Sequence, residues 1–211
     1  MAIRSNLRGY VNTPATERYR ALLEAYIDAK DNNRPQRIGD VFARDAELAF
    51  SLATENIAFP SRVAGADAIA RTLVTDFGAR YSQCRTYYVC DALQPRNGSI
   101  AGLPWLVVMR EPEAGALRIG HGVYDWTFSP GIDGTEPRVA HFHIQIARMD
   151  VIADHDARLL AQVHERLPYP WLSPVALRDE LDALRRAAPA FAFVAPFTEP
   201  AVPLASLTSP R

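Results

Sequence analysis

Four consecutive segments of this sequence have the period-two pattern and the aromatic and β-branched content of β-strands. Short turn-forming stretches separate them, such as Pro95-Arg96-Asn97-Gly98. Strands joined in this way predict an antiparallel meander, whose apolar face helices must cover. The four segments are 85–93 (RTYYVCDAL), 104–111 (PWLVVMRE), 116–128 (ALRIGHGVYDWTF) and 138–152 (RVAHFHIQIARMDVI).

Helices and one strand precede the meander. Thr13-Pro14 predicts a helix start, with Thr as the N-cap and Pro at the first helical position. Segment 46–53 (AELAFSLA) alternates like a strand, and segment 65–81 returns to helical spacing. A shorter helix is expected around residues 38–42. The first helix has one apolar stripe, formed by Tyr19, Leu22, Leu23, Tyr26 and Ile27.

The last sixty residues differ in pattern. Segment 154–166 predicts a helix, and Ser173-Pro174 caps a second one with Arg185 and Arg186 in its last turn. A proline-punctuated apolar stretch follows. We therefore expect an α+β domain over 1–150 and a C-terminal helical, Pro-rich extension over 151–211, packed on the first domain or on a neighbouring subunit.

Composition limits the partners of the chain. Its 211 residues are 48% hydrophobic and 22% charged, with a net charge of −1. This balance is typical of a globular domain and gives no electrostatic reason to expect nucleic acid or a membrane as partner. The N-terminus lacks the apolar core of a signal peptide, and Cys84 and Cys90 are the only cysteines. We expect reduced thiols and a cytoplasmic location.

Three stretches resemble one superfamily. They are 26–50 (YIDAKDNNRPQRIGDVFARDAELAF), 65–73 (GADAIARTL) and 122–128 (GVYDWTF). Together with the element order over residues 14–150, they resemble the SnoaL-like branch of nuclear transport factor 2-like proteins, which includes polyketide cyclases and scytalone dehydratase. The resemblance implies a cone-shaped barrel, cystatin-like, made of a curved antiparallel sheet covered by N-terminal helices. It implies cofactor-free chemistry on a small apolar compound inside the cone.

The same resemblance proposes site residues. Aligned without gaps, the catalytic Asp of scytalone dehydratase falls on Asp31, a pocket tyrosine on Phe50, and a pocket histidine on Tyr87. Asp91 lies four residues after Tyr87, on the same strand face. The second catalytic histidine that the family pattern places near 107–109 is missing from this sequence. We predict Asp31, Tyr87 and Asp91 as an acid–base group. The alternative is that Asp31 caps a helix end and Asp91 ends a strand.

The family register places Tyr124 and Trp126 inward as pocket wall with Phe50, and places His121 and Asp125 outward.

His141 and His143 share one face of segment 138–147, opposite the apolar row of Phe142, Ile144 and Ile146. If they face inward, they belong to the ligand-binding set. The apolar row is the better core, which favours an outward direction, onto a face where relatives often form dimers. Two histidines in H-x-H spacing are a weak metal signal, and no metal site is predicted.

Two functions follow. The first is a cofactor-independent dehydratase, isomerase or cyclase acting on a small apolar carbonyl or polycyclic compound. The second is a non-catalytic module that binds a small ligand or assembles as a homodimer, or a higher homo-oligomer, through the sheet. Phe50 and the missing histidine favour the second, because both remove polar groups that the chemistry needs.

Overall fold

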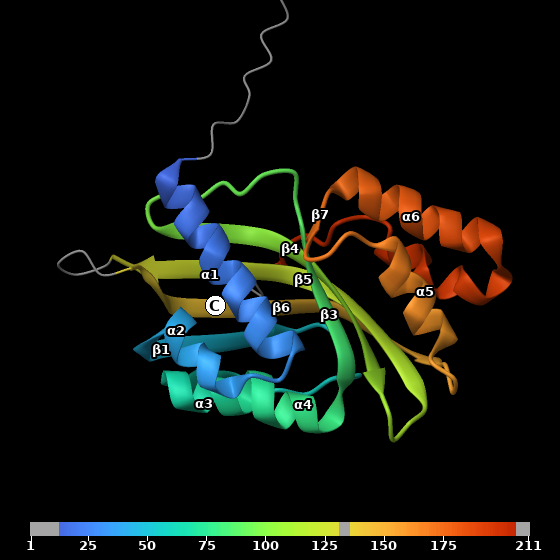
Figure 1. Ribbon diagram of the computed structural model, residues 1–211, viewed down its shortest axis with the longest axis horizontal. Coiled ribbons are helices and arrows are strands. Elements are labelled where there is room, and N and C mark those ends of the chain that lie inside the picture. The colour runs from blue at the N-terminus through green and yellow to red at the C-terminus, as the bar shows by residue number, and fades with distance from the viewer. Residues whose placement is uncertain (1–12, 131–135, 206–211) are drawn as a thin grey trace, which may run out of the picture.

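The computed structural model describes residues 13–130 and 136–205. Residues 1–12, on which the expected absence of a signal peptide rests, lie outside this part, and so do residues 131–135 of the predicted turn at 129–137. Helices pack on both faces of one curved sheet (Figure 1).

The N-terminal helices form as their local sequence predicts. Helix α1 (Pro14–Asp31) starts at Thr13, whose side chain accepts a hydrogen bond from the backbone N–H of Thr16. A short 3₁₀ turn η1 (Pro35–Arg37) leads into α2 (Ile38–Val41). Three continuous helical segments come later in the chain, α3 (Ala66–Ala70), the π-helical η2 (Arg71–Thr75) and α4 (Asp76–Arg80).

The sheet has seven strands, in the order β2-β1-β6-β5-β4-β3-β7. The predicted antiparallel meander is present as β3 (Ser82–Val89), β4 (Ser99–Glu111), β5 (Ala116–Ser129) and β6 (Arg138–Ala153). The sheet as a whole is mixed and not closed, because β1 (Phe42–Leu52) pairs in parallel with β6 and β7 (Trp171–Leu172) in parallel with β3. Strand β2 (Arg62–Ala64) forms the far edge.

Two separate apolar cores lie on the two faces of the sheet. The concave core joins helices α1 to α4 to the inward side chains of the sheet, including Tyr26, Tyr124 and Trp126. The outer core joins Tyr87, Leu106 and other outward side chains of β3, β4 and β5 to the C-terminal extension. The extension therefore covers the outer face of half the sheet.

The C-terminal extension consists of α5 (Arg158–Arg166), β7, α6 (Pro174–Ala187) and the 3₁₀ helix η3 (Pro189–Phe197). Ser173 caps α6 as predicted, by accepting from the N–H of Ala176. The predicted boundary after residue 150 lies inside β6, which continues to Ala153. Beyond η3 the chain turns back along the outer face, where the Leu204 N–H reaches the Gln145 side chain of β6.

The C-terminal extension packs on its own chain, and its apolar stretch is buried against the outer face of the sheet. Self-association through the sheet stays a prediction. Within the described residues, the part of the outer sheet face that the extension leaves uncovered belongs to β1, β2 and part of β6. Among the described helices, none combines the length and the apolar composition needed to cross a bilayer.

Candidate functional site

The concave core encloses a small apolar cavity. Its volume is about 40 Å³, enough for a few water molecules but far below the roughly 300 Å³ at which ligand pockets usually start. Aromatic and aliphatic side chains from α1, η2, α4 and the sheet form most of its wall. They are Tyr26, Lys30, Phe50, Ile57, Phe59, Leu73, Phe77, Trp105, Val107, Met109, Tyr124, Ile144, Ile146 and Met149.

Lys30 is the charged residue in this wall. It continues the apolar stripe of α1 one turn after Tyr26, so the helix carries its side chain into the core, where it is only 7% exposed. Its ammonium donates to Asp31 Oδ1 at 2.9 Å, to Thr86 Oγ1 at 2.8 Å and to Cys84 Sγ at 3.3 Å. Burial lowers the pKa of Lys30, but its neighbours, led by the Asp31 carboxylate, together more than offset this, so the pKa lies above its usual value. Lys30 is thus a cation with all three donors in use.

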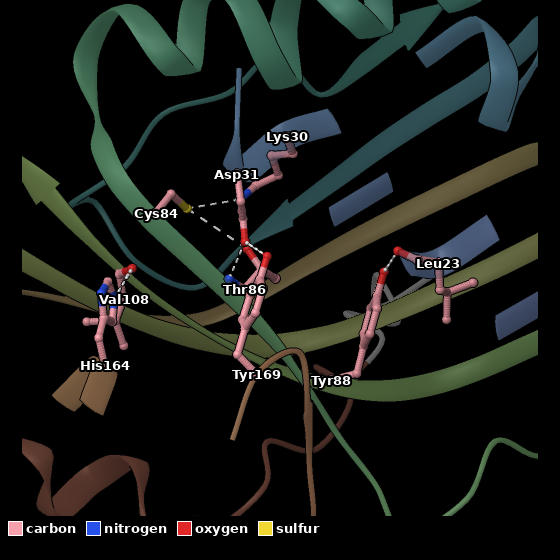
Figure 2. Close-up of polar contacts among 9 residues, drawn as sticks. All are labelled: Leu23, Lys30, Asp31, Cys84, Thr86, Tyr88, Val108, His164 and Tyr169. Atoms are coloured by element: carbon pink, nitrogen blue, oxygen red, sulfur yellow. Dashed lines mark hydrogen bonds and ion pairs between the residues drawn. The ribbon is translucent and has the colours of Figure 1, made fainter. Parts of the chain in front are cut away.

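Asp31 accepts four hydrogen bonds (Figure 2). Oδ1 accepts from Lys30 and from the Thr86 hydroxyl at 3.0 Å, and Oδ2 accepts from the Thr86 N–H at 2.6 Å and from the Tyr169 hydroxyl at 3.0 Å. The two oxygens of a carboxylate offer about four acceptor positions. Asp31 is therefore saturated by the protein itself, and it does not line the cavity.

Cys84 completes this buried polar cluster. Burial, followed by the negative charge of Asp31, raises the pKa of the Cys84 thiol to about 12. The thiol is therefore neutral near pH 7 and is not an activated nucleophile. The cluster of Lys30, Asp31, Cys84 and Thr86 has its polar groups paired internally, which is the condition for burying such groups at low cost.

Two polar atoms of the cavity wall lack partners. The Trp105 indole N–H and the Tyr26 hydroxyl are buried without a hydrogen bond to the described residues. Trp105 stacks on Tyr124, with ring centroids 5.2 Å apart, and Tyr26 packs edge-on against Tyr124 at 6.4 Å. Burial raises the pKa of Tyr26, so its hydroxyl stays protonated. Unpaired buried donors are costly, and both can serve an acceptor on a ligand.

The predicted acid–base group is not assembled at the cavity. Tyr87 lies on the outer face of β3, in the core shared with the extension, where its ring meets Tyr169 edge-on at 5.6 Å. Asp91 is exposed just after the end of β3. The expectation that both line the cone with Asp31 is corrected by this placement. The neighbour Tyr88, not Tyr87, points into the concave core and donates to the Leu23 carbonyl oxygen at 2.9 Å.

The aromatic residues proposed as pocket wall lie on the concave side. Phe50 and Tyr124 line the cavity. Trp126 is buried behind it and stacks on Phe142 at 3.7 Å, so it supports the wall without lining the cavity.

His141 and His143 face outward, on the surface opposite the cone. They border an outer groove with Asp125 and Thr127. Their inward placement in the ligand-binding set is thus corrected, and the apolar row of Phe142, Ile144 and Ile146 fills the core instead. Within the described residues, no group of three His, Cys, Asp or Glu side chains is arranged to hold a metal ion.

Lys30 is the cavity residue that sequence reasoning missed, and the unpaired indole N–H of Trp105, a residue expected in the core or the pocket wall, was missed as well. A signal for Lys30 was present, because a lysine three residues after Ile27 and four after Tyr26 continues an apolar stripe. Trp105 lies on the same strand face as Val107 and Met109, and all three line the cavity. Nothing in the sequence marks its indole N–H as unpaired, since that depends on residues from other strands.

No protein-family model matches this sequence, and no curated protein matches it. Solved structures match in fold at low identity. A nuclear transport factor 2-like superfamily protein from Salmonella enterica is 15% identical with a TM-score of 0.50, covering 61% of this chain and 88% of its own. A scytalone dehydratase-like protein from Novosphingobium aromaticivorans is 16% identical with a TM-score of 0.50, covering 64% and 85%.

A hexachlorocyclohexane dehydrochlorinase, LinA-type3 from Novosphingobium barchaimii, is 13% identical with a TM-score of 0.51, covering 65% of this chain and 89% of its own. At such identities the likeness concerns the fold and does not transfer an activity. Element order, sheet topology and these neighbours agree, and this chain has the fold of the nuclear transport factor 2-like superfamily.

Proposed function

We propose that this chain is a SnoaL-like binding protein that holds one small apolar organic molecule inside its cone and does not transform it. The observation that carries the proposal is the chemistry of the cavity wall. Within the described residues, the wall contains no carboxylate and no imidazole, and its one ammonium, on Lys30, is fully engaged. Such a wall can bind apolar surface but offers no free base for proton abstraction.

The size of the cavity limits the ligand. A benzene-sized ligand needs roughly 150 Å³, several times the present volume of about 40 Å³. Met109 and Met149 in the wall have unbranched side chains that can rearrange, and the stacked pair of Phe50 and Phe59 joins strand β1 to the loop before β2. We expect binding to move these side chains, so that the ligand occupies space they now fill.

The ligand also carries one hydrogen-bond acceptor. Trp105 and Tyr26 have donors without partners among the described residues, and an acceptor such as a carbonyl oxygen would satisfy one of them. A buried donor that gains its partner contributes about 1–3 kcal/mol of binding free energy relative to an apolar analogue.

Calorimetry with two matched probes tests this proposal. We expect cyclohexanone to bind at millimolar or lower concentration, more tightly than methylenecyclohexane, which has the same shape without the acceptor. Ile144→Phe fills the cavity and should abolish binding, whereas Val151→Phe, at an exposed position of the same strand, should not. If neither probe binds the unmodified chain, the cone is only a packed core and the proposal fails.

A lyase is the second candidate, because a dehydrochlorinase and a dehydratase-like protein share the fold and Asp31 lies directly beside the cavity residue Lys30. It requires Asp31 to exchange its present partners for a substrate. Chloride release from hexachlorocyclohexane that is lost in Asp31→Asn, in a variant shown to be folded, would favour the lyase over the binding protein.

A further inference from the structure

Three side chains on the outer face of the sheet stand in one line. Ser51 of β1, His143 of β6 and Asp125 of β5 come from three adjacent strands and project from the face opposite the cone. The strand register produces this arrangement, because Ala49 lies opposite His143 and His143 lies opposite Asp125, with Ser51 two residues beyond Ala49 on the same face.

The distances between them follow the order serine, histidine, carboxylate. Ser51 Oγ lies 2.9 Å from His143 Nε2. On the other side of the imidazole, Nδ1 lies 3.4 Å from Asp125 Oδ2. A carboxylate on the Nδ1 side favours the tautomer with the proton on Nδ1, which leaves Nε2 free to accept the serine proton. A triad of this kind is recognised by geometry and roles, and not by sequence order or fold.

Asp125 is itself held in place. Its Oδ1 accepts from the Gly102 N–H at 2.7 Å, and its Oδ2 accepts from the Gln145 side-chain amide at 2.8 Å. The Gln145 oxygen in turn accepts from the Leu204 N–H at 2.8 Å. The C-terminal stretch therefore holds Gln145, and Gln145 and Gly102 hold Asp125 beside the His143 imidazole.

A groove with a volume of about 340 Å³ lies beside this line. His143 and Asp125 border it, together with Glu47, Ala49, Arg62 and His141, and Ser51 lies just outside its wall. The Arg62 guanidinium is exposed and makes no hydrogen bond or ion pair with the described residues. The groove thus has room for a small molecule, and the Arg62 guanidinium lies in the same wall as the imidazole.

From this arrangement we propose that Ser51, His143 and Asp125 form a second site, which hydrolyses short-chain esters and prefers an acyl chain that ends in a carboxylate. The Ser51 oxygen bonds to the ester carbonyl carbon while His143 Nε2 takes the serine proton. The C–O ester bond then breaks, and the leaving alkoxide receives that proton from His143. Water adds to the acyl-serine in the same manner, releasing the carboxylic acid and restoring Ser51.

The test uses the full chain with two esters of p-nitrophenol, the acetate and the hemisuccinate. We expect p-nitrophenol release, faster with the hemisuccinate, and one fluorophosphonate adduct per chain on Ser51 by intact mass and peptide mapping. Arg62→Gln should remove the preference for the hemisuccinate over the acetate.

Matched variants separate a triad from a reactive surface histidine. Ser51→Ala should abolish the adduct and lower turnover at least tenfold, whereas Ser82→Ala, at another exposed strand serine, should change neither. His143→Gln should lower turnover at least tenfold, and His155→Gln, at an exposed histidine outside the groove, should not. If the adduct is absent or persists in folded Ser51→Ala, or if the two histidine variants behave alike, the proposal is wrong.

Discussion

The Tyr169 hydroxyl donates a hydrogen bond of 3.0 Å to Asp31 Oδ2 and so ties the C-terminal extension to the end of helix α1. The two residues are 138 positions apart in the chain. Because burial and the nearby Asp31 carboxylate both raise the pKa of Tyr169, the phenol stays protonated near neutral pH and can donate to Asp31. This contact occupies the last acceptor position of Asp31 and explains why a residue expected to act as a base is not available as one.

Tyr169→Phe should lower the free energy of unfolding by about 1–2 kcal/mol, because it removes one charge-assisted hydrogen bond at a partly exposed position. Urea denaturation followed by fluorescence measures this. Tyr19→Phe is the matched control, since the Tyr19 hydroxyl makes no hydrogen bond with the described residues and its ring only stacks on Phe128. Equal effects of the two substitutions would show that the Tyr169 contact does not stabilise the fold.

Asp31→Asn should destabilise the chain by about 3–5 kcal/mol, because it leaves the buried Lys30 ammonium without its counter-charge. The double variant Lys30→Met with Asp31→Asn should be more stable than Asp31→Asn alone, since it removes the uncompensated charge as well. Chemical denaturation of both variants checks the prediction. A double variant less stable than the single one would mean that Lys30 does not depend on Asp31.

His164 should make the fold sensitive to mild acid. Burial lowers the pKa of His164 from 6.5 to about 4, and its Nε2 lies 3.3 Å from the Val108 carbonyl oxygen (Figure 2). Between these two values the unfolded chain binds more protons at this residue than the folded chain does, so the free energy of unfolding falls as the pH falls from 6.5 towards 4. His121, whose pKa burial also lowers, contributes in the same direction.

His164→Gln should flatten this pH dependence, and His155→Gln, at an exposed position, should leave it as in the unmodified chain. Thermal or urea unfolding at several pH values between 4 and 7 measures the slopes. A His164→Gln slope as steep as that of the unmodified chain would contradict the assignment.

Gly122→Ala should destabilise the protein by about 3 kcal/mol or more. A Cβ at this position would overlap the Gln145 backbone oxygen of the paired strand and would lie 2.8 Å from Trp105 Cζ2. Gly39→Ala in helix α2 is the control, because a Cβ there meets no atom within 4 Å and alanine favours a helix. Denaturation curves should therefore show a loss at Gly122 and no loss at Gly39.

Local patterns determined most of the fold. The N-caps Thr13 and Ser173 and the four meander strands were all readable from neighbouring residues, because caps and period-two alternation act within a few positions. The faces of β5 and β6 were readable too. Tyr124 points into the cone, as the family register implies, and His143 points away from it, as the apolar row of β6 predicts.

Tertiary structure decided the site. Strand β3 is buried on both faces because the extension covers its outer side, so alternation could not tell Tyr87 from Tyr88. The four hydrogen bonds to Asp31 come from Lys30 of α1, Thr86 of β3 and Tyr169 of the loop before β7, and only folding brings the last two residues to it. Sequence by itself determined where most helices and strands lie and which row of β6 is buried. Only the assembled tertiary structure pairs polar groups from different elements. This pairing decides whether a buried carboxylate is free to act as a base or is used as a structural hydrogen-bond acceptor.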